Sequence, residues 1–188
     1  MKELLKLIQQ LGRKHDNLRV FQDFVEICAC SLSRPFIDRE DRYFAIYSRY
    51  TDEEMQQFYQ MGQILLHELE KAPQDILGQC YMQLELANKQ RGQCFTPLSI
   101  GNLMASILFR QEIEQQGYYT FKRTYLRKRC TYHRFLRNDA TTRLLTHKTQ
   151  LRVIAQDIDL KSVQMCFVQL SLLGIPAEIQ HANPSQVK

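Results

Sequence analysis

Apolar residues recur at helical spacing through the first half of the chain. Between residues 4 and 11 they return every three or four positions, and residues 21–28 repeat the same spacing. Such spacing gathers apolar side chains on one face of a helix, and that face can then pack against a core. The pattern therefore predicts a helical region from Met1 to about Arg110.

Several positions in this region mark helix ends. Thr51 followed by Glu54 is the pattern of a capping box, in which the two side chains satisfy unpaired amides at a helix start. The helix that begins there is expected to end before Pro73, and Asp75 is expected to cap the next one. Pro97 suits the first turn of a further helix, because a proline lacks the amide hydrogen that a helix start cannot use.

The pattern changes in the second half of the chain. Residues 122–148 show no sustained helical or strand period. A β-branched run at residues 151–159 ends with two carboxylates and predicts a strand. Residues 160–173 are amphipathic and predict a helix. Residues 177–181 form a possible second strand. A strand, a helix and a strand in this order predict a βαβ unit, which would begin a parallel sheet.

Composition narrows the class of protein. With 188 residues, 44% of them hydrophobic, the chain can bury one core, or one core with a small appendage. Its N-terminus carries charge in the first turns and no long apolar run, so we expect a cytoplasmic protein without a signal peptide or membrane span. The six cysteines lack the spacing of metal ligands, so no metal site is expected. They are predicted to be buried or incidental thiols: Cys28, Cys30, Cys80, Cys94, Cys130 and Cys166.

The net charge of +5 is concentrated in one segment. Nine of the 25 basic residues and one of the 20 acidic residues lie between Lys122 and Lys148, which leaves 16 basic and 19 acidic residues elsewhere. A cluster of this kind is either a nucleic-acid-binding patch or a sign that the segment has an unusual origin.

Two stretches of the chain resemble a known family. DILGQCYMQLELANKQRGQCFTPLSIGNLMASIL, residues 75–108, resembles the entry to the catalytic domain of N6-adenine DNA methyltransferases, of the kind that serve as modification subunits in type I restriction-modification systems. That family has an Asp-Ile-Leu-Gly…Tyr helix, then Gly-Gln-Phe-Phe-Thr-Pro, then another helix. VIAQDIDLKSVQMCFVQLSLLGIPAEIQH, residues 153–181, resembles the second and third sheet motifs of the same family. Together the two stretches cover about a third of the chain, in the family's order.

The resemblance implies S-adenosylmethionine as cofactor and DNA as substrate. In such enzymes the Gln-Phe-Phe-Thr-Pro loop lies over the bound cofactor, and an acid at the end of the second strand accepts the ribose hydroxyls. Cys94 stands where the family has an aromatic residue, which removes stacking area, and Asp159 is expected to cap the next helix. The positions implied to bind the cofactor are Gln93, Cys94, Phe95, Thr96, Pro97, Leu98 and Asp157.

Each motif also has a purely structural interpretation. Phe95 can pack on the following helix while Thr96 caps it, and an Asp-x-Asp pair after a strand is commonly a helix cap. The occurrence of both motifs in the family's order favours the cofactor interpretation.

Two further motifs of the family are missing from the sequence. The family has a strand that runs into (Asp/Glu)-Pro-x-Cys-Gly-(Ser/Thr)-Gly, a turn that seats the methionine end of the cofactor, but residues 118–150 contain no glycine. The family also has (Asn/Asp)-Pro-Pro-(Tyr/Phe), which binds the flipped adenine. Asn183-Pro184-Ser185 lacks the second proline and the aromatic residue, and the chain ends before a target-recognition region would begin. No catalytic residue is therefore assigned.

A change of reading frame accounts for the missing glycine motif. One permitted set of codons for Lys122 to Thr131, read one nucleotide later, encodes Asn-Glu-Pro-Thr-Cys-Gly-Ser-Gly-Ala, which is the missing motif at its expected place. Tyr132 to Phe135 can then yield Thr-Ile-Gly-Phe, and the original frame returns between Lys148 and Leu151. On this hypothesis the basic cluster is the out-of-frame product of a glycine loop.

These inferences predict an α/β fold with a helical N-terminal region, residues 1–88, and a partial methyltransferase domain, residues 89–188. The second region is expected to hold an incomplete Rossmann-type sheet and the aberrant basic segment 122–148. The predicted function is adenine-specific DNA methylation of the restriction-modification type, impaired in this chain, with a protein subunit as a further partner. Two alternatives stay open: a nucleic-acid-binding protein that uses residues 122–148, and a helical interaction protein.

Overall fold

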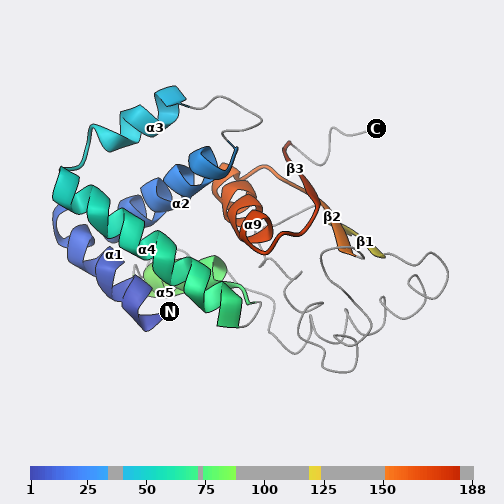
Figure 1. The fold of residues 1–188 in the computed structure, drawn as a ribbon, viewed down its shortest axis with the longest axis horizontal. Helices are drawn as coiled ribbons and strands as arrows, with labels where there is room; N and C mark the ends of the chain where they lie inside the picture. Colours follow the sequence, from blue (N-terminus) through green and yellow to red (C-terminus); the bar gives the residue numbers. More distant parts are fainter. Residues whose placement is uncertain (34–39, 72–73, 88–118, 124–150, 183–188) are drawn as a thin grey trace. The chain divides into compact units, whose positions relative to one another are not determined.

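The computed structural model describes residues 1–33, 40–71, 74–87, 119–123 and 151–182 (Figure 1). These residues are mostly helical, with a small parallel sheet near the C-terminus, and no complete Rossmann sheet is seen among them. They divide into two units. The first contains residues 1–71 and the helix from Ile76, and the second contains residues 72–75 and the sheet. The predicted domain boundary after residue 88 lies outside the described residues and stays a prediction.

The first unit is a bundle of helices. Its core holds large apolar side chains that are almost completely buried, such as Ile8, Phe24 and Leu65. Each such side chain stabilises the folded unit by about 1.5–3 kcal/mol relative to exposure. The helices of this unit are α1 (Lys2–His15), α2 (Asn17–Ser33), α3 (Glu40–Tyr47), α4 (Asp52–Lys71) and α5 (Ile76–Ala87).

A single residue separates the first two helices. Asp16 has a φ of 73°, outside the helical region, and its Oδ1 accepts hydrogen bonds from the main-chain amides of Leu18 and Arg19. These bonds satisfy amides at the start of α2 that have no partner within the helix. A side chain at Gly12 would overlap that of Asn17, so the tight joint between the helices requires glycine there.

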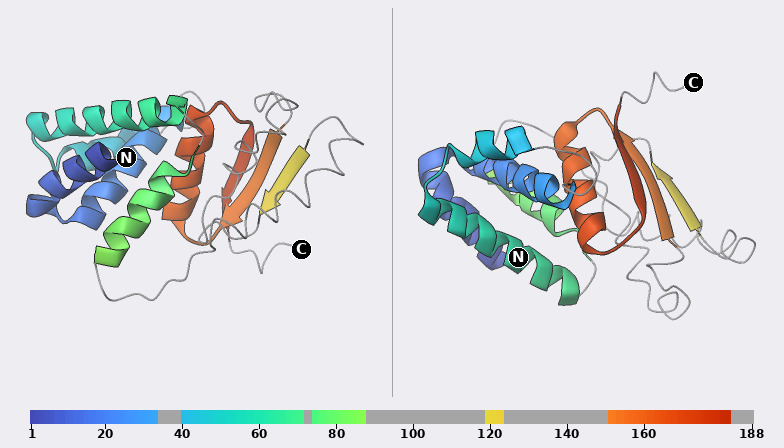
Figure 2. Two further views of the ribbon diagram at one scale, coloured as in Figure 1. Left: turned by 90° about the horizontal axis from the view of Figure 1, so that it is seen from below. Right: turned by 45° about the horizontal axis from the view of Figure 1, so that its top comes forward.

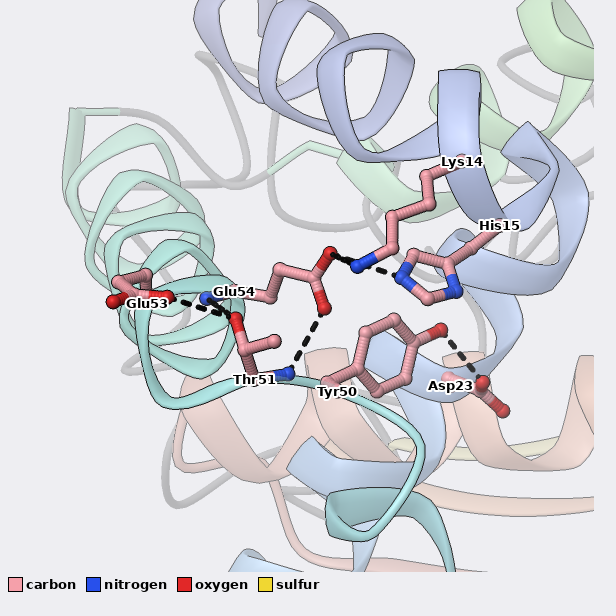
Figure 3. Close-up of polar contacts among 7 residues, drawn as sticks. All are labelled: Lys14, His15, Asp23, Tyr50, Thr51, Glu53 and Glu54. Carbon is pink, nitrogen blue, oxygen red and sulfur yellow. Dashed lines mark hydrogen bonds and ion pairs between the residues drawn. The ribbon is translucent and has the colours of Figure 1, made fainter.

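Thr51 and Glu54 form the predicted capping box at the start of α4. The Glu54 main-chain amide donates to Thr51 Oγ1 at 3.3 Å, and the Thr51 amide donates to Glu54 Oε2 at 2.9 Å (Figure 3). The other carboxylate oxygen of Glu54 accepts from Lys14 Nζ at 2.9 Å and lies 3.0 Å from His15 Nε2. One glutamate therefore caps α4 and also ties it to the end of α1. The helix ends at Lys71, before Pro73, as predicted.

A second polar contact lies beside this cap. Tyr50 is 8% exposed and donates its hydroxyl hydrogen to Asp23 Oδ2 at 2.8 Å (Figure 3). Arg49 Nη1 donates to the other oxygen of Asp23 at 3.1 Å. Burial and the Asp23 carboxylate raise the pKa of Tyr50. The Tyr50 ring also meets Phe58 edge-on, with 4.7 Å between ring centroids. The loop between α3 and α4 is thus fixed to α2 by polar bonds and to α4 by aromatic packing.

The second unit contains a parallel sheet with strand order β1-β2-β3. Residues of β2 pair in parallel with both neighbours, and Val153 and Ala155 of this strand are buried. Helix α9 connects β2 to β3 and packs on the sheet (Figure 2). The predicted βαβ unit is confirmed, whereas strand β1 was not predicted. The elements are β1 (Tyr119–Arg123), β2 (Leu151–Asp157), α9 (Leu160–Leu172) and β3 (Ala177–His181).

Gly174 ends helix α9. It has a φ of 68°, and its amide donates to the Ser171 carbonyl while the amide of Ile175 donates to the Leu170 carbonyl, both at 3.0 Å. This pair of bonds is a Schellman motif, which satisfies the last carbonyls of a helix and needs a residue that tolerates the left-handed region. The buried Ile175 then leads the chain back into the sheet.

We expect acid to weaken the helical unit through Glu54. The hydrogen bond from Lys14, then that from the Thr51 amide, lower the pKa of Glu54 from its ordinary value of 4.5 to about 2. A lowered folded-state pKa means that the stabilisation is present above about pH 4.5 and is lost as the pH falls toward 2. Glu54→Gln should cost about 1 kcal/mol at pH 7, after allowance for solvent screening, and the difference from the wild type should shrink over this pH range.

Urea unfolding followed by circular dichroism at a series of pH values measures this effect. Glu53→Gln is the matched control, because it removes the same charge one residue earlier, where Glu53 contacts only the Thr51 hydroxyl among the polar contacts of Figure 3. Equal, pH-independent losses in the two variants would contradict the role given to Glu54.

Candidate cofactor site

The carboxyl ends of three parallel strands meet at one edge of the sheet. Such an edge is where open α/β sheets bind ligands. Strands β1, β2 and β3 end there at Arg123, Asp157 and His181, and the last two residues are direct partners in the β2–β3 register. The helix that follows β2 also begins at this edge, so its main-chain amides face the same region.

Asp157 is the only one of the predicted cofactor-binding residues that lies among the described residues. Its side chain accepts a hydrogen bond from the Asp159 main-chain amide at 2.7 Å, and its carbonyl accepts from the Ala182 amide at 3.1 Å. The residue is completely buried, with an exposed fraction of 0%. A ribose could reach this carboxylate only after a local movement, which would use part of the binding free energy.

Asp159 caps helix α9, as predicted. Its Oδ1 accepts from the Lys161 amide at 3.3 Å, and its Oδ2 accepts from the Ser162 hydroxyl at 2.9 Å. The two carboxylates of the Asp-x-Asp pair therefore have different roles. Asp157 orders the turn after β2, and Asp159 satisfies the first turn of the helix.

Two residues at this edge were not singled out from the sequence. Ile158, between the two acids, is 56% exposed although it is a large apolar side chain. His181 Nε2 lies 3.0 Å from the Ile158 carbonyl oxygen, and since a carbonyl oxygen only accepts, this nitrogen carries the hydrogen. The sequence places His181 at the end of a predicted strand, but only the parallel register shows that it lies beside Asp157.

The loop predicted to cover the cofactor, Gln93 to Leu98, lies outside the described residues. The structure therefore does not test whether Gln93, Cys94, Phe95, Thr96, Pro97 and Leu98 approach Asp157. Most of the basic segment 122–148 also lies outside, and only Lys122 and Arg123 are placed, at the end of β1.

The part of the chain that the structure describes can be searched for metal-binding groups, reactive thiols and membrane-spanning helices. No group of three or more His, Cys, Asp or Glu side chains suited to a metal ion is present there. Cys30, Cys80 and Cys166 are buried free thiols, and Cys28 is a half-buried free thiol whose pKa is raised to about 12 by its partial removal from water. None of the described helices has the length and apolar character needed to span a bilayer.

Comparisons with protein-family models, with characterised proteins and with solved structures found no match to this chain. The resemblance to adenine methyltransferases therefore rests on the sequence motifs alone.

We expect Asp159 to act as a helix cap without being needed for ligand contact. Asp159→Ala should destabilise the start of α9 by about 1 kcal/mol, because two groups at the helix start lose their acceptor. Asp159→Asn should cost a few tenths of this, since asparagine is an equally good cap. Amide hydrogen exchange across residues 160–165, read by mass spectrometry, measures the change. Unaltered exchange in the alanine variant would contradict the assignment.

Proposed function

We propose that this chain is a DNA N6-adenine methyltransferase-like protein of the restriction-modification type, which uses S-adenosylmethionine as cofactor and is impaired in catalysis. The observation that carries the proposal is the position of Asp157. It is a buried acid at the carboxyl end of the middle strand of a parallel sheet, two residues before the cap of the following helix. Sheets of this kind bind nucleoside cofactors at that place, and an acid there accepts ribose hydroxyls.

The order of the strands also supports the proposal. Strands that follow one another in sequence lie side by side, in parallel, from β1 to β3. This order matches one half of a Rossmann-type sheet, in which the first strand runs into the turn that seats the cofactor. Strand β1 ends at Arg123, directly before the residues that would hold the glycine turn.

The roles of the cofactor-binding residues follow from the resemblance. Phe95 would place its ring against the cofactor, with Gln93, Thr96 and Pro97 shaping the loop, and Asp157 would bind the ribose. The reaction of such enzymes is an in-line attack of the adenine N6 nitrogen on the methyl carbon of the sulfonium; the thioether leaves and the nitrogen loses a proton. Positioning supplies much of the rate in reactions of this kind.

The missing loops account for the proposed impairment. Residues 118–150 hold no glycine, so no tight turn of the family's type can seat the methionine end of the cofactor. Residues 1–188 also hold no (Asn/Asp)-Pro-Pro-(Tyr/Phe) motif, which in the family hydrogen-bonds the flipped adenine. The lineage is that of an enzyme, but this sequence lacks the parts that bring the methyl group and the base together.

The gene should carry the missing motif in another frame. We expect the +1 reading frame across codons 122–135 to encode the Pro-x-Cys-Gly-x-Gly motif, with a compensating insertion or deletion before codon 151. Determining the nucleotide sequence tests this directly. Codons that cannot yield the motif would remove the frameshift hypothesis and would favour a basic segment that is functional in itself.

We also expect this chain to bind S-adenosylmethionine weakly. A ring contact at Phe95 adds about 1 kcal/mol beyond burial, and charge-assisted hydrogen bonds at Asp157 add about 1.5–3 kcal/mol. The sum is at most about −4 kcal/mol, which corresponds to a dissociation constant of about 1 mM or weaker, so isothermal titration calorimetry should detect no tight binding.

Two variants make this calorimetric test specific. Replacing residues 122–130 by Asn-Glu-Pro-Thr-Cys-Gly-Ser-Gly-Ala should restore binding, and adding Asp157→Ala to that variant should abolish it again. Micromolar binding by the unmodified chain would show that the proposed impairment is wrong. A restored chain that folds, as circular dichroism reports, but does not bind would contradict the proposed cofactor.

A further inference from the structure

Helix α4 carries a second apolar stripe besides the one that faces the core. Its core stripe consists of buried side chains, among them Phe58, Met61 and Leu65. The second stripe lies on the flank of the helix, where Tyr59 is 68% exposed and Leu66 is 42% exposed. Its members, four, three and four residues apart, are Met55, Tyr59, Gly62 and Leu66. This spacing is the one by which two helices pack along a seam.

The segment of α4 that carries this stripe lacks charged side chains. Residues 55–66, MQQFYQMGQILL, contain no acidic or basic side chain, although α4 lies at the surface of its unit. The polar positions between the apolar ones are glutamines, such as Gln56 and Gln63. Depletion of charge with enrichment of aromatic residues is typical of the centre of a protein interface. A helix face that served only to contact water would be expected to carry charges.

Gly62 has no evident role within its own unit. A glycine inside a helix costs about 0.5–1 kcal/mol relative to alanine. Yet a Cβ built at Gly62 would meet no heavy atom of the described residues within 4 Å. The helical unit therefore does not need glycine at this position. A close approach by another molecule would need it, because only glycine leaves the helix backbone bare.

The stripe is complementary to itself under a two-fold axis. Suppose that two α4 helices pack antiparallel, and that the two-fold axis crosses them at the height midway between Gln60 and Met61. Tyr59 of each copy then faces Gly62 of the other. In the same arrangement Met55 faces Leu66. The largest side chain of the stripe thus meets the position without a side chain, twice, as a symmetric interface requires. We infer that this face of α4 binds a second copy of this chain.

The flanks of the seam fit the same arrangement. Gln56 of one copy and Gln63 of the other lie on the same flank of the seam, offset by two residues along the helix, and an amide side chain supplies both a donor and an acceptor. No charge has to be removed from water along the central part of the seam, which avoids the main cost of burying a helix surface. At its two ends, Asp52 comes near Glu70 of the other copy. This like-charge pair weakens the dimer at low salt and is screened at high salt.

Exposed aromatic residues also lie on α3, which adjoins the start of α4. The Tyr47 hydroxyl donates to Asp52 Oδ1 at 2.7 Å, so α3 adjoins the start of α4. Tyr47 is 37% exposed and Phe44 is 60% exposed. With Tyr59 and Leu66 they are the exposed large apolar side chains of the described helical unit. A pair of short helices, even with the α3 side chains added, buries less than the roughly 1,600 Å² of a standard interface. The dimer should therefore be weak, with a dissociation constant in the micromolar range.

Sedimentation velocity of the full chain tests the inference. The wild type should pass from monomer to dimer between about 1 and about 200 µM. Gly62→Leu should weaken dimerisation about tenfold or more, because the new side chain occupies the space of the partner's tyrosine. The same variant should melt no lower than the wild type, since leucine favours helix and nothing described lies where its side chain begins.

Two further variants distinguish association through this seam from nonspecific association. Tyr59→Ala combined with Gly62→Leu restores the pairing of a large with a small residue and should recover dimerisation. Gln60→Leu adds the same side chain to α4 away from the seam and should leave dimerisation unchanged. Raising the salt from about 0.05 to about 0.5 M should strengthen the dimer, whereas association through contaminating nucleic acid would weaken.

Several results would overturn the inference. A monomer at all concentrations would mean that no second copy covers this face. A dimer unaffected by Gly62→Leu would place the interface elsewhere. Loss of the dimer in Gly62→Leu without recovery in the double variant would contradict the proposed pairing, and dissociation at high salt would assign the association to charge attraction. None of these outcomes depends on cofactor binding, so they test the inference independently of the proposed function.

Discussion

The parallel pairing of β2 with its two neighbours is the constraint on which the candidate site depends. Because the strands run in the same direction, their carboxyl ends meet at one edge, and the register brings Asp157 beside His181. An antiparallel arrangement of the same segments would place these residues at opposite edges. Parallel pairing also requires a connection that crosses over the sheet, and α9, with a cap at Asp159 and a stop at Gly174, provides it.

The helical unit depends on a different balance of forces. Burial of apolar side chains supplies most of its stability, but the directions of its helices are set by a few polar contacts. Asp16 fixes the joint between α1 and α2, while Glu54 ties the start of α4 to the end of α1. Asp23 holds the loop that precedes α4 through Tyr50 and Arg49. These contacts act at helix ends, where main-chain groups lack partners and a side chain can define geometry most strongly.

The sequence predicts local features of this protein better than its longer-range ones. The capping box at Thr51 and the cap at Asp159 depend on neighbouring residues alone, and both are confirmed. The position of His181 beside Asp157 depends on strand register, which the sequence does not specify without the fold. Strand β1 was missed because its five residues lie next to an aperiodic basic segment that shows no buried face. Within the candidate site, the sequence predicted Asp157 and the capping role of its neighbour Asp159. That Ile158 and His181 lie beside these residues follows only from the structure.

The thiols of the helical unit are poorly reactive while the unit is folded. A thiol reacts with oxidants and alkylating reagents as the thiolate, and a pKa of about 12 leaves Cys28 protonated at neutral pH. Cys30 and Cys80 are buried, so reagents reach them only when the helices separate. The rate at which these thiols are modified therefore reports how often the bundle opens. Modification of these native cysteines can thus measure the opening of the helical unit without an added label.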